Sequence, residues 1–329
     1  MKYNWLFILM LFISPFLTLC MNSWFSIWIS MEFNLMVFIV YLMLNNIYIY
    51  DLCMKYFLIN SFGSSMYILM SNFSMFFMNN FIYFFFMNIC IMLKLGMMPF
   101  HFWFMDLMKN LNWYSCLLLS TWQKFIPFIL LLYMYIQDLM LMLIFISGLF
   151  SMIFCMNQVS LKKILGYSSI NHMCWMFFSL IFSEILWLMY FFIYFFINFV
   201  IMNIFKNFNI NYMMDLYFYM NNNYLKFFFL MLMFSLGGLP PFLGFIMKWY
   251  IIYYLIIFNN FMYMFIVVFF SLIFLYYYFR MVFNIMFFNY LSLKNFFYLN
   301  YKISNYNMFL FSNIFLLFYM SMFLFFFYF

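Results

Sequence analysis

Residues 88–106 read NICIMLKLGMMPFHFWFMD, and this stretch decides the fold. Its lysine, Lys94, lies in an apolar run five residues before Pro99. An unbroken helix around it would be too long for one straight membrane span of about 20 residues. Because proline lacks a backbone N–H and Gly96 loosens the turn beside it, we expect the helix to break there. Freed backbone groups are tolerated at membrane depth only where protein or a wet cavity surrounds them, so the break and the amine are predicted to share one site.

The same pattern recurs later in the chain. Residues 96–100 read GMMPF and residues 238–242 read GLPPF, and Lys248 lies near the second copy. A pair of Gly/Pro-interrupted hydrophobic segments is the sequence pointer to a transporter-type pathway. The expected helix breaks lie at Gly96 and Pro99, and at Gly238, Pro240 and Pro241.

Composition indicates a membrane protein. Of the 329 residues, 72% are hydrophobic and only 6% are charged, which leaves too little polar surface for a soluble domain. We therefore expect one polytopic transmembrane domain over residues 1–329. The formal net charge is +7, but the lysines are scattered singly, so no nucleic-acid site is predicted. The six cysteines have neither CxxC nor Cys/His spacing, so no metal or iron–sulfur site is predicted.

Residue usage also indicates the base composition of the gene that encodes the chain. The chain contains 39 methionines, no alanine and a single arginine. Phe, Ile, Asn, Tyr, Met and Lys have A/T-rich codons, and heavy methionine use is expected where ATA is read as methionine. We infer an A/T-biased mitochondrial gene, so much of the aromatic and methionine content is interpreted as drift on a lipid-facing surface.

Hydropathy and turn residues predict eleven spans, of which the fourth and the ninth are broken. They cover residues 3–21, 24–44, 54–76, 80–108, 113–134, 139–157, 164–183, 185–205, 226–258, 261–284 and 306–328. The longer segments 206–225 and 285–305 are predicted to be polar loops. If the N-terminus lies in the matrix, every loop lysine falls on the matrix side, as the positive-inside rule requires. We therefore predict a C-terminus in the intermembrane space.

The order of the broken spans suggests an internal repeat. Because the fourth and ninth spans cross in opposite directions, we predict an all-α bundle of two inverted five-helix repeats. The first repeat would cover residues 1–134 and the second residues 139–284, with an extra C-terminal helix over residues 306–328.

Four ionisable residues remain at membrane depth. They are Glu32, Lys94, Lys124 and Lys248, and each costs about 2.5–3.5 kcal/mol at mid-membrane. Such residues are by default assigned to an ion or proton path. Pairing between Glu32 and Lys94 would let both stay ionised, although a static structural ion pair is the alternative. Lys124 has no evident acidic partner, so it could exchange a proton or extend toward a membrane interface. Extension toward an interface is a stronger alternative for Lys248.

Two histidines are secondary candidates. His172 is predicted to share a helix face with Ser168, Asn171 and Trp175, which are spaced at i, i+3, i+4 and i+7. This face could carry a water chain with imidazole as a shuttle, or His172 could be a packing residue. His101 follows the Pro99 break directly and could cap the freed carbonyls.

Motifs for cofactor binding are missing from the sequence. The chain has no GxGxxG or Walker loop and no cysteine cluster. We expect no cofactor in this chain, and any electrons to travel in another protein.

Four runs together resemble a known family. Residues 92–103, 121–124, 162–173 and 235–249 read MLKLGMMPFHFW, TWQK, KKILGYSSINHM and SLGGLPPFLGFIMKW. They resemble the antiporter-like membrane-arm subunits of mitochondrial NADH:ubiquinone oxidoreductase, respiratory complex I. The resemblance extends to about Arg280, and eleven spans agree with a shortened animal form that lacks three N-terminal helices of bacterial relatives.

The resemblance implies a function and a setting. Glu32 and Lys94 would form the pumping pair, and Lys124 and Lys248 would continue the hydrophilic axis. Proton movement across the inner mitochondrial membrane would be coupled to NADH oxidation and ubiquinone reduction. NADH, FMN, iron–sulfur clusters and ubiquinone would belong to other subunits, while membrane-arm and accessory subunits and lipids such as cardiolipin would be the partners. The family usually has Pro-Glu where this chain has Met105-Asp106, which puts a role for Asp106 in question.

Two alternatives remain at this point. The first is a cation/proton antiporter subunit of the Mrp type, which the fold and the lysines would suit equally. The second is a structural scaffold of the membrane arm, in which the buried charges are static.

Overall fold

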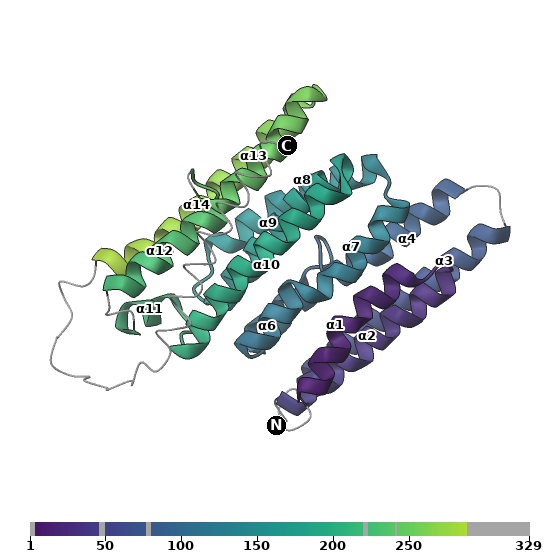
Figure 1. Ribbon diagram of the computed structural model, residues 1–329, viewed down its shortest axis with the longest axis horizontal. Coiled ribbons are helices and arrows are strands. Elements are labelled where there is room, and N and C mark those ends of the chain that lie inside the picture. Colours follow the sequence, from purple (N-terminus) through teal and green to yellow (C-terminus); the bar gives the residue numbers. More distant parts are fainter. Residues whose placement is uncertain (1–3, 46–49, 77–79, 220–222, 241, 288–329) are drawn as a thin grey trace.

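The protein is described by a computed structural model that covers residues 4–45, 50–76, 80–219, 223–240 and 242–287 (Figure 1). These ranges are helical, and apart from one isolated bridge between Ser160 and Tyr212 they contain no β-structure. The predicted C-terminal helix over residues 306–328, most of the predicted loop 285–305, and Pro241 lie outside the described residues.

Fourteen helices follow one another along the described part of the chain. The first seven are α1 (Asn4–Cys20), α2 (Trp24–Asn45), α3 (Tyr50–Phe76), α4 (Asn80–Leu95), α5 (Phe102–Asn110), α6 (Trp113–Ser120) and α7 (Trp122–Met134). The other seven are α8 (Gln137–Met156), α9 (Leu161–Phe182), α10 (Glu184–Asn207), α11 (Met213–Tyr219), α12 (Asn223–Gly237), α13 (Leu243–Ile257) and α14 (Phe261–Phe287).

The long helices lie side by side in one bundle (Figure 1). Helices α1–α3 occupy one flank and α12–α14 the other, with α4, α6, α7, α9 and α10 between them. The α6–α7 pair is the most enclosed candidate span, since 89% of its most apolar window is buried, against 28% for α14. The pair therefore lies at the centre of the bundle, where it packs against α1, α4 and α10.

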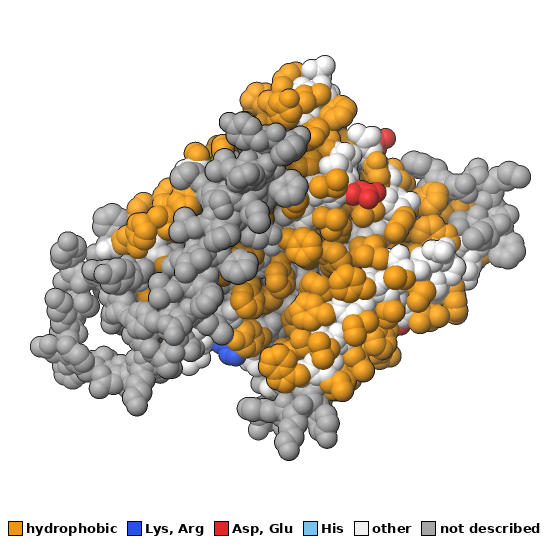
Figure 2. Space-filling view, viewed as in Figure 1, with side chains coloured by type: hydrophobic (Ala, Val, Ile, Leu, Met, Phe, Trp, Pro, Cys, Tyr) orange, Lys and Arg blue, Asp and Glu red, His pale blue; other side chains and the backbone are white. Residues whose placement is uncertain are grey.

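The outer surface is apolar. Hydrophobic side chains cover much of the described surface that is visible in Figure 2, with only scattered charged groups between them. Large side chains such as Phe265 and Leu272 on α14 are 65% and 58% exposed. Five candidate spans, counting α6 and α7 together, are long and apolar enough to cross a membrane. The chain is a multi-pass membrane protein, because such a surface is stable only against lipid or other apolar partners.

The first helix break follows from the backbone of Gly96. Helix α4 ends at Leu95, and Gly96 has a φ of +67°, a conformation that strains any residue with a side chain. The N–H of Gly96 donates to Leu93 O at 3.2 Å, and the N–H of Met97 donates to Met92 O at 3.2 Å. These two bonds form a Schellman motif, which satisfies two of the carbonyls at the end of the helix.

The second break repeats this backbone motif. Helix α12 ends at Gly237, and Gly238 has a φ of +75°. The N–H of Gly238 donates to Ser235 O at 3.2 Å, and the N–H of Leu239 donates to Phe234 O at 3.2 Å. The two breaks predicted from the glycines and prolines are therefore built alike.

Two segments differ from the sequence-based expectation. The predicted loop 206–225 contains the short helix α11, whose start is stabilised by Asp215, because its carboxylate accepts from the N–H of Tyr212 at 2.8 Å. The predicted fifth span is divided into α6 and α7 at Thr121, whose backbone leaves helical geometry with φ −124° and ψ −76°. The Thr121 hydroxyl donates to Leu117 O at 2.7 Å, which stabilises this irregular turn.

Candidate functional site

Lys94 occupies the last turn of α4, directly before the first break. Its ammonium nitrogen lies 3.4 Å from the sulfur of Met31 on α2. The Glu32 carboxylate is near enough to act electrostatically on it, but the two do not form an ion pair. Neighbouring residues of a helix point about 100° apart, so a lysine that faces Met31 is turned away from Glu32. The expected Glu32–Lys94 pair is therefore not formed in this structure.

The Glu32 carboxylate keeps unused hydrogen-bonding capacity. Its Oε1 atom is enclosed and has no hydrogen-bond partner among the described residues. An enclosed oxygen without a partner is costly, so this side of the partly exposed carboxylate can accept a hydrogen bond from a nearby cation or a water molecule. Glu32 and Lys94 thus come from neighbouring helices, and no direct contact between their charged groups is formed in this structure.

Two aromatic residues follow the break, and one of them caps the end of α4. The indole N–H of Trp103 donates to Leu93 O at 3.1 Å, which adds a second donor to a carbonyl of the last α4 turn. The Nδ1 atom of His101 lies 3.3 Å from Pro99 O, and the ring stacks on Phe154. His101 thus contacts a carbonyl of the connecting turn and not one at the end of α4, so the expected capping of the freed α4 carbonyls is not formed in this structure.

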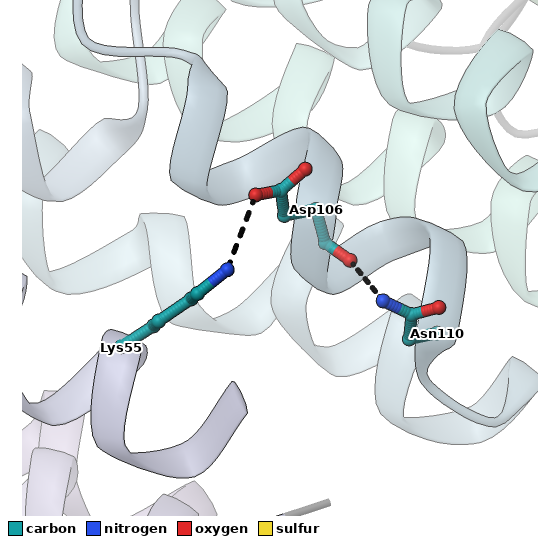
Figure 3. A network of polar contacts seen from close by, with 3 residues as sticks. All are labelled: Lys55, Asp106 and Asn110. Atoms are coloured by element: carbon teal, nitrogen blue, oxygen red, sulfur yellow. Dashed lines mark hydrogen bonds and ion pairs between the residues drawn. The ribbon is translucent and has the colours of Figure 1, made fainter. Parts of the chain in front are cut away.

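Asp106 lies apart from this buried group. Figure 3 shows its carboxylate facing Lys55 of α3, with 3.6 Å between Oδ2 and Nζ, and the two side chains are 59% and 55% exposed. Its backbone carbonyl accepts from the Asn110 amide at 3.1 Å. Exposed ion pairs contribute little to stability, so this pair is a surface contact.

Lys124 lies in the centre of the bundle on α7 and is 3% exposed. Its ammonium nitrogen donates to the Ser169 hydroxyl on α9 at 2.9 Å and lies 4.7 Å from the centre of the Phe104 ring. Among the described residues no carboxylate forms an ion pair with it. A side chain directed at α9 does not extend toward a membrane interface, so the geometry opposes the interfacial alternative.

A cavity of about 30 Å³ joins the neighbourhoods of Lys94 and Lys124. It has room for about two water molecules. Besides the two lysines, its polar lining residues are Asn34, Tyr56, Asn60, Trp103 and Gln123. The helices α2, α3, α4, α5 and α7 therefore enclose a small polar space at the first break.

A hydrogen-bonded amide pair forms one wall of this cavity. The Asn34 amide donates to Gln123 Oε1 at 2.7 Å, and the Tyr56 hydroxyl donates to the same oxygen at 3.2 Å. The Ser14 hydroxyl donates to Asn34 Oδ1 at 3.1 Å. These contacts join α1, α2, α3 and α7, and they hold Gln123 beside Lys124 in one orientation.

The axis continues through the buried face of α9. Ser169, the partner of Lys124, lies one turn before His172, which is 5% exposed. The Nδ1 atom of His172 lies 2.9 Å from the Tyr190 hydroxyl, whereas its Nε2 atom is enclosed without a hydrogen-bond partner in the described structure. Of the other predicted members, the Ser168 hydroxyl donates to its own helix at Leu165 O, at 2.9 Å.

Asn171, another predicted member of this axis, is also buried on α9. Its Oδ1 atom has no hydrogen-bond partner in the described ranges. Asn171 and Ser168 therefore lie on the same helix as His172, and neither is directly hydrogen-bonded to its ring in the described structure.

A second cavity, of about 10 Å³, lies beside His172. It has room for about one water molecule. His172, Tyr190, Tyr194 and Ser235 supply its polar lining, and Leu236 and Gly244 of the second break complete it. The imidazole is thereby connected to the break by a space that one water could fill.

Lys248 reaches back from α13 to the end of α12 and is 5% exposed. Its ammonium nitrogen donates to Leu236 O at 3.2 Å and to Gly237 O at 2.9 Å, and it lies 5.7 Å from the centre of the Trp175 ring. The side chain therefore points into the bundle rather than toward an interface.

Several polar residues of this axis were not singled out from the sequence. Ser169 lay inside a matched run, and the Gln123 side chain is adjacent to Lys124, but neither carried a spacing signal. Asn34 and Tyr56 belong to helices whose rotation the sequence did not determine. One signal could have identified these residues, because each is a polar side chain within an apolar span. The lysines were identified by the same criterion.

Comparison with known proteins places this arrangement in a family. The profile of the family described as NADH:quinone oxidoreductase/Mrp antiporter, TM, matches residues 21–274. The chain belongs to this family. The matched range includes Glu32, Lys94, Lys124, Lys248 and both helix breaks.

Named members of the NADH:quinone oxidoreductase/Mrp antiporter family are similar over most of their length. NADH-ubiquinone oxidoreductase chain 2 of Anopheles gambiae is 37% identical over 296 residues, which cover 87% of each chain. The protein of the same name from Aedes aegypti is 36% identical over 298 residues, again 87% of each chain.

Two solved structures share the fold. A chain of respiratory complex I from Thermus thermophilus superposes with a TM-score of 0.77 at 18% identity, covering 87% of this chain and 71% of that one. A chain of the Mrp complex from a Dietzia species superposes with a TM-score of 0.69 at 11% identity, covering 85% and 60%. At these identities the likeness concerns the fold alone.

Proposed function

We propose that the chain is a proton-translocating, antiporter-like subunit of respiratory complex I in the inner mitochondrial membrane. The observation that carries this proposal is the polar cavity between Lys94 and Lys124, deep in a bundle whose outer surface is apolar. Similarity to NADH-ubiquinone oxidoreductase chain 2 over most of both chains supports the assignment.

The path begins with the open contact between Glu32 and Lys94. Bringing their charges together would stabilise the ammonium form of Lys94, and separating them would favour release of its proton. Because the lysine is held only by the Met31 sulfur in this structure, a small shift of α2 against α4 would change that contact. A released proton would enter the cavity that Lys94 shares with Lys124.

From the cavity the proton would continue along α9. Lys124 is bonded to Ser169, and His172 lies one turn further along the same helix beside the second cavity. That cavity is lined by Leu236, whose carbonyl Lys248 contacts. The two cavities along the route have room for about two and about one water molecules, and such waters would transfer protons between the fixed groups.

The energies involved are of matching size. Moving one charge across 100 mV costs about 2.3 kcal/mol. Breaking one buried ion pair costs about 3–5 kcal/mol. A conformational change that forms or opens the Glu32–Lys94 contact could therefore supply enough free energy to move one proton.

The remaining parts of the proposal concern the assembly. NADH, FMN, iron–sulfur clusters and ubiquinone are proposed to bind to other subunits, and this chain to carry no redox site. Its partners would be the other membrane-arm and accessory subunits, together with lipids such as cardiolipin. The distribution of loop lysines supports an N-terminus in the matrix and a C-terminus in the intermembrane space.

The test is the proton stoichiometry of purified, reconstituted complex that carries Lys94→Met. We expect fewer protons translocated per NADH oxidised, or loss of both activities together in a normally assembled complex. Lys55→Met is the matched control. It removes an exposed lysine from the surface of the same protein, so it should leave both activities unchanged. Normal pumping and normal oxidation in the Lys94→Met complex would contradict the proposal.

A second candidate is a cation/proton antiporter subunit of the Mrp type. The family match includes Mrp antiporters, and the fold of one Mrp chain is similar. This function predicts cation-dependent proton movement without NADH, measured in vesicles that contain the chain. Proton movement that requires NADH oxidation would exclude it. A purely structural scaffold predicts instead that neutral substitutions of the lysines impair assembly and leave pumping per complex unchanged.

A further inference from the structure

The C-terminal end of α12 presents two carbonyls that its backbone does not satisfy. In the Schellman motif at Gly238, the bonds from Gly238 and Leu239 satisfy Ser235 O and Phe234 O. Leu236 O and Gly237 O are left over, and they lie at the negative end of the helix dipole. At membrane depth such carbonyls need a donor or a cation.

The group that fills this position is a cation carried on another helix. The Lys248 ammonium of α13 contacts Leu236 O at 3.2 Å and Gly237 O at 2.9 Å. On another side it faces the Trp175 ring at 5.7 Å, which is within the range of a cation–π interaction. Two oxygens and one aromatic face thus surround a single positive charge.

The shape of the break is adapted to this charge. A Cβ atom on Gly238 would lie 2.9 Å from the Lys248 nitrogen and 2.8 Å from its Cδ. The glycine therefore provides both the backbone turn and the space for the ammonium group. The small cavity beside His172 is also lined by Leu236, whose carbonyl contacts the ammonium.

We propose that Leu236 O, Gly237 O and the face of Trp175 form a binding site for a small monovalent cation, which the Lys248 ammonium occupies in this structure. The ligands are neutral, and no described carboxylate forms an ion pair with Lys248. A site without anionic ligands does not compensate the desolvation cost of a divalent ion. The class of ion that the site fits is therefore an ammonium or alkali ion.

At this site, a free monovalent ion would compete with the Lys248 ammonium for the two carbonyls. Whenever its side chain withdraws from the two carbonyls, they become available to a free monovalent ion, and that ion and the lysine cannot occupy them together. This property concerns cation binding at the second break and does not depend on proton translocation by the chain. The first break lacks the arrangement, because the Lys94 ammonium contacts the Met31 sulfur of another helix.

The experiment compares hydrogen exchange at the second break in purified complex. Lys248→Met removes the internal cation, so peptides spanning residues 234–245 should exchange several-fold faster than in the unmodified complex. Adding methylammonium chloride should slow this exchange in a saturable manner. Tetramethylammonium chloride at equal ionic strength should not, because the ion is larger and has no N–H donor.

Lys124→Met is the matched control, because it removes a buried ammonium that contacts a serine hydroxyl instead of the α12 carbonyls. Its exchange at residues 234–245 should not respond to methylammonium. Unchanged exchange in Lys248→Met, or equal slowing by both ions, would overturn the proposal. The readout is local exchange, so it is independent of the pumping result for Lys94→Met.

A further variant covers the case in which Lys248→Met fails to assemble. Lys248→Gln keeps an amide that can donate to a carbonyl but carries no charge, so it should assemble, and its exchange at residues 234–245 should still be slowed by methylammonium. Exchange at the rate of the unmodified complex without a response to methylammonium would overturn the proposal, because a neutral donor would then replace the cation completely. Failure of the glutamine variant to assemble, while Lys124→Met assembles, would support a requirement for the charge.

Discussion

The two helix breaks have the same backbone turn but place their lysines on opposite sides of it. Lys94 precedes Gly96 by two residues and belongs to α4, whereas Lys248 follows Gly238 by ten residues and belongs to α13. At the first break an indole, that of Trp103, reaches back to the helix end, and the ammonium remains free of the backbone. At the second break the ammonium itself reaches back.

The difference indicates how a repeated motif acquires two uses. The free ammonium of Lys94 borders Glu32 and the first cavity, so its position can change without opening the helix end. The ammonium of Lys248 stabilises the end of α12, so its movement exposes two carbonyls. We expect the first break to tolerate changes at its lysine structurally, and the second to couple its lysine to backbone stability.

The largest expected effect is at the approach of α13 to α12. A Cβ atom in Gly244→Ala would clash with Ser235 O, a backbone atom that no rotamer change can move. We expect a loss of about 4 kcal/mol or more in the free energy of unfolding and little assembled complex on native gels. Gly63→Ala is the control at the first break, where the added Cβ would lie 3.3 Å from the flexible Lys94 stem. Normal assembly of Gly244→Ala would contradict the packing described for the second break.

The next effect separates the two turn glycines. Alanine in a left-handed conformation costs about 1–2 kcal/mol at either Gly96 or Gly238. Both also add a close contact, since the Cβ of Gly96→Ala would lie 2.9 Å from Phe104 Cβ and that of Gly238→Ala 2.8 Å from Lys248 Cδ. Gly238→Ala should cost more, because moving Lys248 also breaks its contacts with Leu236 O and Gly237 O. Thermal inactivation of the two purified variants would measure this order, and a larger loss in Gly96→Ala would contradict the role of Lys248 in stabilising the second break.

A smaller effect distinguishes the two tryptophans. Trp103→Phe removes the second donor to Leu93 O, which keeps its bond from Gly96 N–H, and should destabilise the first break by about 0.5–1.5 kcal/mol. Trp175→Phe should cost less, because the Trp175 indole N–H has no hydrogen-bond partner among the described residues. Local hydrogen exchange over residues 90–97 should rise only in the first variant. A larger rise there in Trp175→Phe would argue against capping by the indole.

The smallest effect concerns the exposed pair of Lys55 and Asp106. A double-mutant cycle with Lys55→Met and Asp106→Asn should give a coupling energy below about 1 kcal/mol, because both side chains are more than half exposed. Proton pumping should be unchanged in both single variants. A coupling energy as large as that of a buried pair would place Asp106 within the functional axis.

Helix breaks could be predicted from sequence because they depend on local chemistry. Glycine and proline change the backbone wherever they occur, so both broken helices were located from a few residues. The division of α6 and α7 at Thr121 was not predicted, although Pro127 inside α7 was a partial signal. The short helix α11 was missed because its polar, Asn- and Tyr-rich surroundings favoured a loop.

Side-chain contacts of the axis were less predictable. The sequence predicted that Glu32 and three lysines lie at membrane depth, because each stands in an apolar segment. It did not show that Lys94 faces Met31 instead of Glu32, because that depends on the rotation of α2 against α4. The bonds from Lys124 to Ser169 and from Asn34 to Gln123 join helices distant in sequence, so no local spacing identifies them.

The sequence by itself determined that this protein is an all-helical, multi-pass membrane protein with two similar breaks and charges at membrane depth. These properties depend on composition and local backbone preference, which act within a few residues. Only the tertiary structure decided that one break leaves its ammonium beside a cavity and the other binds its ammonium with backbone carbonyls. That outcome depends on the relative rotation and approach of helices, which is set by packing over the whole bundle.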